Sequence, residues 1–133
     1  GDTLFGGAGN DNLIGSFGRD LLVGEGGADT FTYFGLAESP ASSSERDLIS
    51  GFEQGLDKID LHHVDANTKA FGNQAFTFIG SQLFNGTPGQ MRIATDALTG
   101  NLVVNMDVDG NGAADMQIEM QFVSSLSASD FIL

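Results

Sequence analysis

The first 32 residues repeat with a period of nine, and no other feature of the sequence constrains the fold as strongly. A partial copy, GDTLF at 1–5, precedes three full copies: GGAGNDNLI at 6–14, GSFGRDLLV at 15–23 and GEGGADTFT at 24–32. Glycine recurs at positions one and four of the copies, aspartate at position six and an apolar residue at position eight. A phase kept over all copies indicates stacked structural units rather than unrelated turns.

The residue types within each copy predict a turn followed by a short strand. Six glycine-rich residues form a turn whose backbone can adopt positive φ, and the next three form a strand whose position-eight side chain points inward. Two copies complete one loop of a coil, so Asp2 stacks near Asp20 and Asp11 near Asp29, 18 residues later. Carboxylates stacked about 4.8 Å apart repel each other unless a cation lies between them. A hard divalent cation with flexible oxygen coordination is calcium.

The nonapeptide resembles the repeat of RTX (hemolysin-type) calcium-binding proteins, in which the chain forms a parallel β-roll. The resemblance implies that backbone carbonyls of two stacked turns bind Ca²⁺ together with the aspartates, and two or more ions are expected. The implied residues are Gly7, Gly9, Asp11, Gly24, Gly26 and Asp29 for one complete site, and Gly15, Phe17 and Asp20, shared with Asp2, for a second. Ser16, Gly18 and Gly27 belong to the same turns, and Ser16 and Glu25 replace the glycine of position two.

The repeat returns in degenerate form after a loop of small residues at 35–46. RDLI at 46–49 copies RDLL at 19–22, and EQGLDKI at 53–59 places glycine, aspartate and isoleucine at positions four, six and eight. Asp47 and Asp57 could thus complete the sites begun in the turns 15–20 and 24–29. Alternatively, both aspartates only accept hydrogen bonds within their local turns.

Three later blocks resemble the C-terminal domain of serralysin-type metalloproteases and of other RTX exoproteins. They are RDLISGFEQGLDKIDLHHVDANT at 46–68, QAFTFIG at 74–80 and the terminal ASDFIL, and with the repeat they extend the resemblance over the whole chain. Gly51 stands where relatives often have Asp. Neighbours on a strand face opposite ways, so His62 and His63 are not expected to share a zinc ion. One of them should pack or hydrogen-bond near the roll, and the other should be solvated.

The C-terminal half alternates between apolar and polar residues in 102–109 and 116–122, which predicts two half-buried antiparallel strands. Phe76 and Phe78, and Met91 and Ile93, suggest two more. The expected fold is therefore all-β, with a short parallel β-roll capped by an antiparallel sheet packed on its end. We expect one domain with a roll at 1–34, a loop and degenerate turns at 35–68, and the cap with a secretion signal at 69–133.

The turn between the two long strands carries oxygen side chains at alternate positions, in Asp107, Asp109, Asn111 and Asp115. This spacing resembles a calcium loop of the Asp-x-Asp-x-Asn-Gly type. An EF-hand is excluded because the place of its bidentate Glu is taken by Ile118, inside a strand. A hairpin calcium loop closed by Asp115 and a plain hairpin turn both remain open.

Composition removes several classes of function. The 18 acidic residues against five scattered basic ones give a net charge of -13, which excludes a nucleic-acid groove binder and an anionic-membrane binder. Cysteine is absent, no stretch of 18 apolar residues could span a membrane, and no His-Glu-x-x-His or other catalytic motif is present. A non-catalytic module is expected.

The terminal SLSASDFIL at 125–133 resembles the uncleaved secretion signal of type I exporters in Gram-negative bacteria, although a final edge strand would explain it as well. Gly1 falls within a repeat and no N-terminal export signal is seen, so we expect the C-terminal part of a larger secreted protein with upstream domains. Such a module would stay unfolded in the calcium-poor cytosol and fold outside the cell. The alternative is a carbohydrate-binding accessory module, like those of alginate epimerases. The acidic surface opposes it, and only Tyr33 is a good candidate for an exposed aromatic platform.

Overall fold

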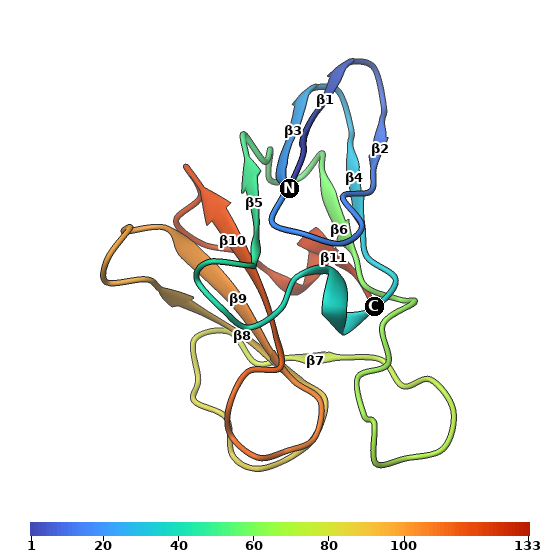
Figure 1. Cartoon of the computed structure of the whole chain (residues 1–133), viewed down its shortest axis with the longest axis vertical. Helices are drawn as coiled ribbons and strands as arrows, with labels where there is room; N and C mark the ends of the chain where they lie inside the picture. The colour runs from blue at the N-terminus through green and yellow to red at the C-terminus, as the bar shows by residue number, and fades with distance from the viewer.

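The computed structural model describes all 133 residues, which form two β-sheets, two short 3₁₀ turns and no α-helix. The first sheet has the strand order β1-β3-β5-β10-β9-β8-β7, and the second has the order β11-β6-β4-β2 (Figure 1). The strands are β1 Thr3–Ala8, β2 Asn12–Leu13, β3 Leu21–Gly26, β4 Thr30–Thr32, β5 Asp47–Ser50, β6 Lys58–Asp60, β7 Thr77–Phe78, β8 Gln90–Thr95, β9 Leu102–Asp107, β10 Met116–Gln121 and β11 Phe131–Ile132. The 3₁₀ turns are η1 Leu36–Glu38 and η2 Ala128–Asp130. Neither helical turn approaches the length and apolar character that crossing a membrane requires.

The nonapeptide repeats alternate between the two sheets, and their predicted stacking is confirmed. β1 pairs in parallel with β3, with Thr3 opposite Leu21, and β2 pairs in parallel with β4, with Asn12 opposite Thr30. Each partner lies 18 residues further along the chain. The expected parallel β-roll is therefore present, with turns stacked in two columns, one on each side of the coil.

The position-eight side chains line the inside of the roll in two continuous rows, one on each sheet. The rows are Leu4, Leu22, Ile49 and Met120 on the first sheet, and Leu13, Phe31, Ile59 and Phe131 on the second. All but Leu4 are buried, and Leu4 packs against the same hydrophobic core. Each buried side chain of this size contributes about 1.5–3 kcal/mol. The apolar period thus continues into strands that carry no glycine-aspartate repeat.

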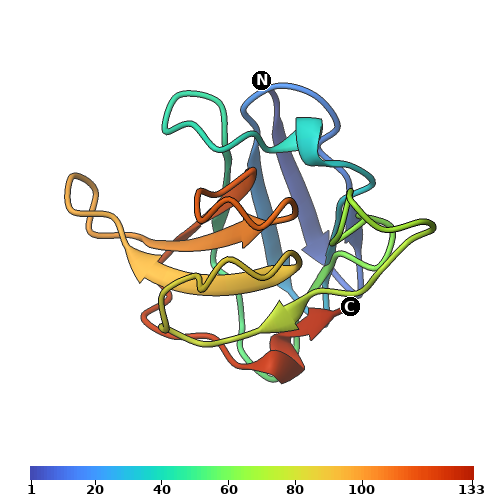
Figure 2. The same cartoon turned by 90° about the horizontal axis from the view of Figure 1, so that it is seen from below.

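The C-terminal antiparallel sheet caps the end of the roll, as expected, and joins it by continuing the first sheet. β8, β9 and β10 are antiparallel, as predicted, but β10 also pairs in parallel with β5 of the roll. The antiparallel strands therefore extend the first sheet, which twists so that β8 and β9 run across the direction of β1 and β3 (Figure 2). β11 pairs in parallel with β6, so β10 and β11 together form the last turn of the roll.

β9 was expected to be half-buried, but all six of its residues are buried. Its polar face lies under other polar side chains instead of solvent: Gln117 Nε2 donates a 2.7 Å hydrogen bond to Asn105 Oδ1, and Asp107 is enclosed by the following loop. The position of β9 between β8 and β10 keeps both of its edges paired.

A buried ion-pair cluster joins the long loop of the roll to the antiparallel strands. Arg46 Nε donates to Glu119 Oε2 at 2.9 Å, and the Arg46 guanidinium also pairs with Asp96 and hydrogen-bonds to Gln117. Burial alone would raise the pKa of Glu119, but hydrogen bonds from Asn101 and Arg46 hold it below its usual range. Because Arg46 immediately precedes β5, this cluster fixes where the roll resumes after the loop.

Candidate calcium-binding turns

The position-six aspartates form two hydrogen-bonded ladders, one in each column of turns. In one column, Asp11 N donates to Asp29 Oδ1 at 2.9 Å, and Asp29 N donates to Asp57 Oδ1 at 2.9 Å. In the other column, Asp2 N donates to Asp20 Oδ1, and Asp20 N donates to Asp47 Oδ1 at 2.8 Å. Both degenerate copies therefore continue the ladders in the order expected from the sequence.

In four of these aspartates, the second carboxylate oxygen is buried and has no hydrogen-bond partner: the Oδ2 atoms of Asp11, Asp20, Asp29 and Asp47. A buried carboxylate oxygen without a partner costs free energy unless an opposite charge accompanies it. Burial raises the pKa of Asp47 to about 7; the backbone N–H of Asp20 opposes this shift, and the Asp20 charge adds to it. These unpartnered oxygens are the atoms that a hard cation would bind, so the residues fit calcium.

The glycine at position one makes room for these oxygens. A Cβ on Gly24 would lie 2.3 Å from Asp29 Oδ2, and one on Gly15 would lie 2.7 Å from Asp20 Oδ2. A Cβ on Gly6 would lie 2.9 Å from Asp11 Oδ2 and 2.7 Å from the carbonyl oxygen of Gly24. The Gly24 carbonyl oxygen and the Asp11 carboxylate therefore both border the space beside Gly6, between the two stacked turns.

The remaining turn positions keep one backbone shape despite the sequence changes. Positions two and four have positive φ in each copy; the values are 93° and 120° at Gly7 and Gly9, 66° and 108° at Ser16 and Gly18, and 69° and 129° at Glu25 and Gly27. Ser16 and Glu25 hold this conformation at a cost of about 1–2 kcal/mol each. The Phe17 side chain is 75% exposed, so only its backbone faces the neighbouring turn. The Gly26 carbonyl accepts a 2.9 Å hydrogen bond from Gly9 N.

Asp57 differs from the other inner aspartates because both of its carboxylate oxygens have partners. Oδ1 accepts from Asp29 N, and Oδ2 accepts a 2.8 Å hydrogen bond from Glu53 N in its own turn. Asp47 accepts from Asp20 N but keeps a free Oδ2. The sequence treats Asp47 and Asp57 alike, whereas the structure gives only Asp47 a buried oxygen without a partner.

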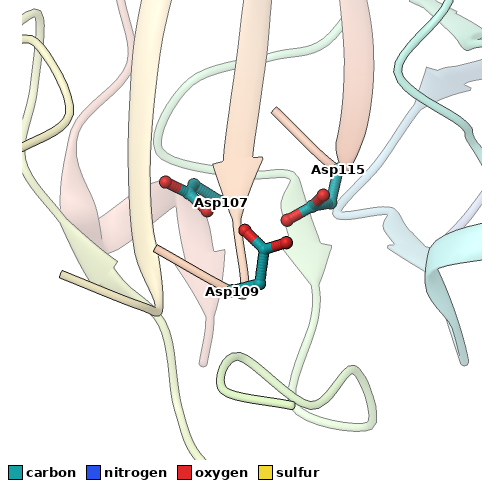
Figure 3. Close-up of side chains that lie close together, drawn as sticks. All are labelled: Asp107, Asp109 and Asp115. Atoms are coloured by element: carbon teal, nitrogen blue, oxygen red, sulfur yellow. The ribbon is translucent and has the colours of Figure 1, made fainter. Parts of the chain in front are cut away.

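The loop after β9 brings three carboxylates together. The candidate ligand oxygens of Asp107, Asp109 and Asp115 lie within 4.8 Å of one another and face a common space (Figure 3). Asp107 accepts hydrogen bonds from Gly110 N and Gly112 N at 2.8 and 2.9 Å, and Asp115 Oδ2 accepts one from Val108 N at 2.8 Å. The fourth candidate, Asn111, points its oxygen to Ala113 N at 2.8 Å.

The two histidines do not lie on a strand, so the expectation that they face opposite ways is wrong. They follow β6 in a turn, with ring centroids 3.7 Å apart, and both are exposed. His62 Nδ1 lies 2.5 Å from Asp60 Oδ1, and the His63 ring stacks on Phe34. Tyr33 was expected to be exposed, but it is 1% exposed and belongs to the hydrophobic core. Its buried hydroxyl, which lies beside the Asp47 carboxylate, is a feature that the sequence pattern did not reveal.

The fold is shared with known proteins. The solution structure of the AlgE6R3 subunit from the Azotobacter vinelandii mannuronan C5-epimerase is 26% identical, with a TM-score of 0.65, covering 98% of this chain and 66% of that chain. The AlgE6R2 subunit of the same epimerase is 25% identical, with a TM-score of 0.61, covering 93% of this chain and 71% of that chain. None of the curated proteins compared with the chain matches it.

A protein-family comparison covers nearly every residue. The family described as peptidase M10 serralysin C terminal matches residues 3–133, and this match confirms the RTX and serralysin resemblance seen in the sequence. The observed β-roll agrees with the roll-type fold of the two epimerase subunits. The chain therefore belongs to the peptidase M10 serralysin C-terminal family.

Proposed function

We propose that the chain is a non-catalytic module that binds calcium through its stacked turns and folds as it does so. The observation that carries this proposal is the set of four buried aspartate oxygens without hydrogen-bond partners, in Asp11, Asp20, Asp29 and Asp47. The ligand set of the first column is Asp11 and Asp29 with the carbonyls of Gly7, Gly9, Gly24 and Gly26. The second column uses Asp20 and Asp47, with Asp2 and the carbonyls of Gly15 and Phe17 at its open end.

Electrostatics links binding to folding. The net charge of -13 makes the unliganded chain repel itself, and each bound Ca²⁺ removes two negative charges from the compact state. The binding turns do not exist in the unfolded chain, so the free energy of binding stabilises the fold directly. Magnesium resists dehydration and requires octahedral geometry, so it should replace calcium poorly.

The experiment is a calcium titration followed by far-UV circular dichroism, starting in EGTA. The chain should be largely disordered at first, and its β signal should appear at roughly 0.1–1 mM Ca²⁺, the range of extracellular modules. Asp29→Asn should raise the calcium midpoint. Asp65→Asn is the matched control, because Asp65 accepts hydrogen bonds only from its local loop, from Asn67 N and Gln74 N. A cooperative β spectrum that persists in EGTA would contradict the proposal.

The loop of Asp107, Asp109 and Asp115 is a second candidate calcium site within the same function. Its three carboxylates already converge, and the ion would sit at the end of the β9–β10 hairpin. Isothermal titration of Asp109→Asn should show one ion fewer than the unmodified chain, with little change in folding. An unchanged stoichiometry would identify the loop as a plain hairpin turn.

Export is the second part of the proposed function. We infer that the module lies in a secreted protein with further upstream domains, and that residues 130–133 act as a signal for a type I exporter of a Gram-negative cell. In the folded state Asp130 and Phe131 are 2% and 7% exposed, so an exporter could read them only before folding. Replacing Asp130 to Leu133 by four glycines should keep the protein inside a host that carries a matching exporter. Secretion at the unmodified level would place the signal elsewhere.

A second candidate function is a carbohydrate-binding accessory module. It is favoured by the structural similarity to two subunits of a mannuronan C5-epimerase. The net charge of -13 opposes an anionic polysaccharide, and the burial of Tyr33 removes the aromatic platform that the sequence suggested. Binding to a glycan array containing neutral and acidic oligosaccharides would distinguish this function from a purely structural and export role.

A further inference from the structure

Phe122 continues the apolar alternation of β10 but lies outside the core. The preceding residues of that face, Ile118 and Met120, are buried, whereas Phe122 is 84% exposed. The reversal comes from the backbone, because Phe122 has a φ of 65°, which turns the chain at the end of β10. A bulky residue rarely adopts this conformation, and here the ring gains no burial in exchange.

The fold does not require an aromatic residue at this bend. Gln121 lies opposite Ser50 in the parallel pair of β10 and β5, so Gly51 is the residue of β5's chain that follows in step with Phe122. Gly51 has a φ of 77°, and a Cβ placed on it would meet nothing within 4 Å. Glycine therefore makes the neighbouring bend without strain. A strained and exposed phenylalanine in the same place points to a role outside the fold.

The Phe122 ring borders a groove over the strands β8 and β9. One hollow of about 390 Å³ lies beside the ring, and a second of about 450 Å³ shares Thr95, Leu102 and Ser124 with it. A third hollow, of about 220 Å³, shares Arg92 and Thr95 with the second. Together the three hollows form the β8–β9 groove. The first two each have the size of a ligand site, about 300–1,000 Å³.

The β8–β9 groove is lined by neutral polar groups. No carboxylate lines the first two hollows, although the chain has 18 acidic residues, and the one carboxylate of the third, Asp96, is paired with Arg46. Four hydroxyls line the first two hollows without hydrogen-bonding within the protein, and they belong to Ser81, Thr95, Ser124 and Ser125. Such a lining suits a ligand that exchanges many neutral hydrogen bonds, and it offers nothing to a metal ion or a basic peptide.

Arg92 adds a fixed donor to the groove. Its Nε donates to the Gln82 carbonyl at 2.7 Å, its Nη2 lies 3.5 Å from the Ser81 carbonyl, and its guanidinium lies 5.8 Å from the centroid of the Phe84 ring. These contacts leave Nη1 without a hydrogen-bond partner in the protein, and no carboxylate forms an ion pair with Arg92. The guanidinium is therefore held in place and can donate to a ligand without breaking an existing ion pair.

We propose that the β8–β9 groove binds a chain of neutral sugars. The Phe122 ring stacks on the apolar face of one sugar, and the hydroxyls of the groove and Arg92 hydrogen-bond to the sugar hydroxyls. The net charge of -13 disfavours an anionic polysaccharide, and an extended peptide finds no free backbone edge, because both edges of β8 and of β9 are paired. The inference rests on the second candidate function, carbohydrate binding, and names its site.

The test uses the calcium-saturated chain on a glycan array of neutral and acidic oligosaccharides, followed by isothermal titration with the neutral oligosaccharide that binds best. Phe122→Gly should weaken binding about 10- to 100-fold, as the loss of an aromatic anchor does, and should raise the urea midpoint because glycine tolerates the bend. A ring that served only the fold would not move binding and stability in opposite directions. Phe71→Ala is the matched control, because Phe71 is also fully exposed but lies outside the groove, and its variant should bind like the unmodified chain.

The outcomes separate this site from the function on which it rests. Neutral-sugar binding that survives Phe122→Gly would place the sugar elsewhere and overturn this inference alone. A chain that binds only acidic oligosaccharides would overturn the assignment to neutral sugars. A chain that binds no glycan would overturn the carbohydrate-binding function as well, whereas its calcium titration would still test the calcium function.

Discussion

Replacing Gly24 by alanine should damage the calcium site without straining the backbone. The new Cβ would lie 2.3 Å from Asp29 Oδ2 and 3.0 Å from its Cγ, and Gly24 has no positive φ that alanine would have to avoid. Distances this short cannot be relieved by a small adjustment, so the Asp29 carboxylate must leave the place where it faces Asp11. The damage is therefore directed at a ligand rather than at the fold of the turn.

The expected loss of calcium affinity in Gly24→Ala follows from the cost of overpacking a well-packed position, about 1–3 kcal/mol. Alanine also restricts the unfolded chain more than glycine does, which stabilises the fold by about 0.4–1 kcal/mol. The difference between the two central values is about 1.3 kcal/mol and its upper limit is about 2.6 kcal/mol, so calcium affinity should drop about 10- to 80-fold if this cost falls on ion binding. The lower part of that range is expected when the carboxylate keeps one contact with the ion.

The matched control is Gly26→Ala, two residues further along β3. A Cβ on Gly26 meets nothing within 4 Å, and its φ is not positive. Calcium titrations of both variants, followed by circular dichroism at one protein concentration, should give a raised midpoint for Gly24→Ala and an unchanged or slightly lowered one for Gly26→Ala. Equal midpoints would show that Asp29 Oδ2 is not a ligand.

Three further changes test other parts of the structure in urea at saturating calcium. Glu25→Gly should stabilise the protein by about 1 kcal/mol, because glycine tolerates the φ of 69°; Glu25→Gln, which removes only the charge, should not. Arg46→Met should destabilise it by about 3–5 kcal/mol by leaving Glu119 buried without its ion pair, and a mild effect would show that the cluster adapts. Folding lowers the pKa of Glu119, so the stability that this carboxylate contributes is present above the pKa of Glu119 in the unfolded chain. That stability is lost as the pH falls through the pKa of Glu119 in the folded protein, and Arg46→Met should flatten this loss. Phe131→Ala should cost about 3–5 kcal/mol, whereas Ile132→Ala, at an exposed position, should cost much less.

The uniform part of the roll could be predicted from the sequence, because one period fixed both the register and the order of the aspartates. The last turn of the roll, formed by β10 and β11, could not be predicted, because the segment between these strands contains no glycine and repeats no motif. Only the apolar residues Met120 and Phe131 keep the inward pattern there. Two separated apolar residues cannot be distinguished from ordinary strand residues in a sequence.

The stacking of the aspartates could be predicted to the level of the residue but not of the atom. Asp47 and Asp57 occupy equivalent positions, and what separates them is a backbone N–H of Glu53 that reaches Asp57 Oδ2. Tyr33 looked like a surface aromatic because it borders a polar loop. Its burial depends on core residues from distant strands, which no local pattern encodes.

The closure of the roll by its last strands sets the order in which the chain can fold. Neighbouring repeat turns lie 18 residues apart, whereas β5 and β10 meet through residues 71 apart, as in the hydrogen bond between Ser50 and Gln121. Pairings between distant segments cost more loop-closure entropy and form more slowly than local ones. The pairings of β1 with β3 and of β2 with β4 can therefore form early, but the finished roll needs the final residues to leave the ribosome. A chain without its end stays open, and under the proposed export function this delay would give a transporter time to engage it before the structure closes.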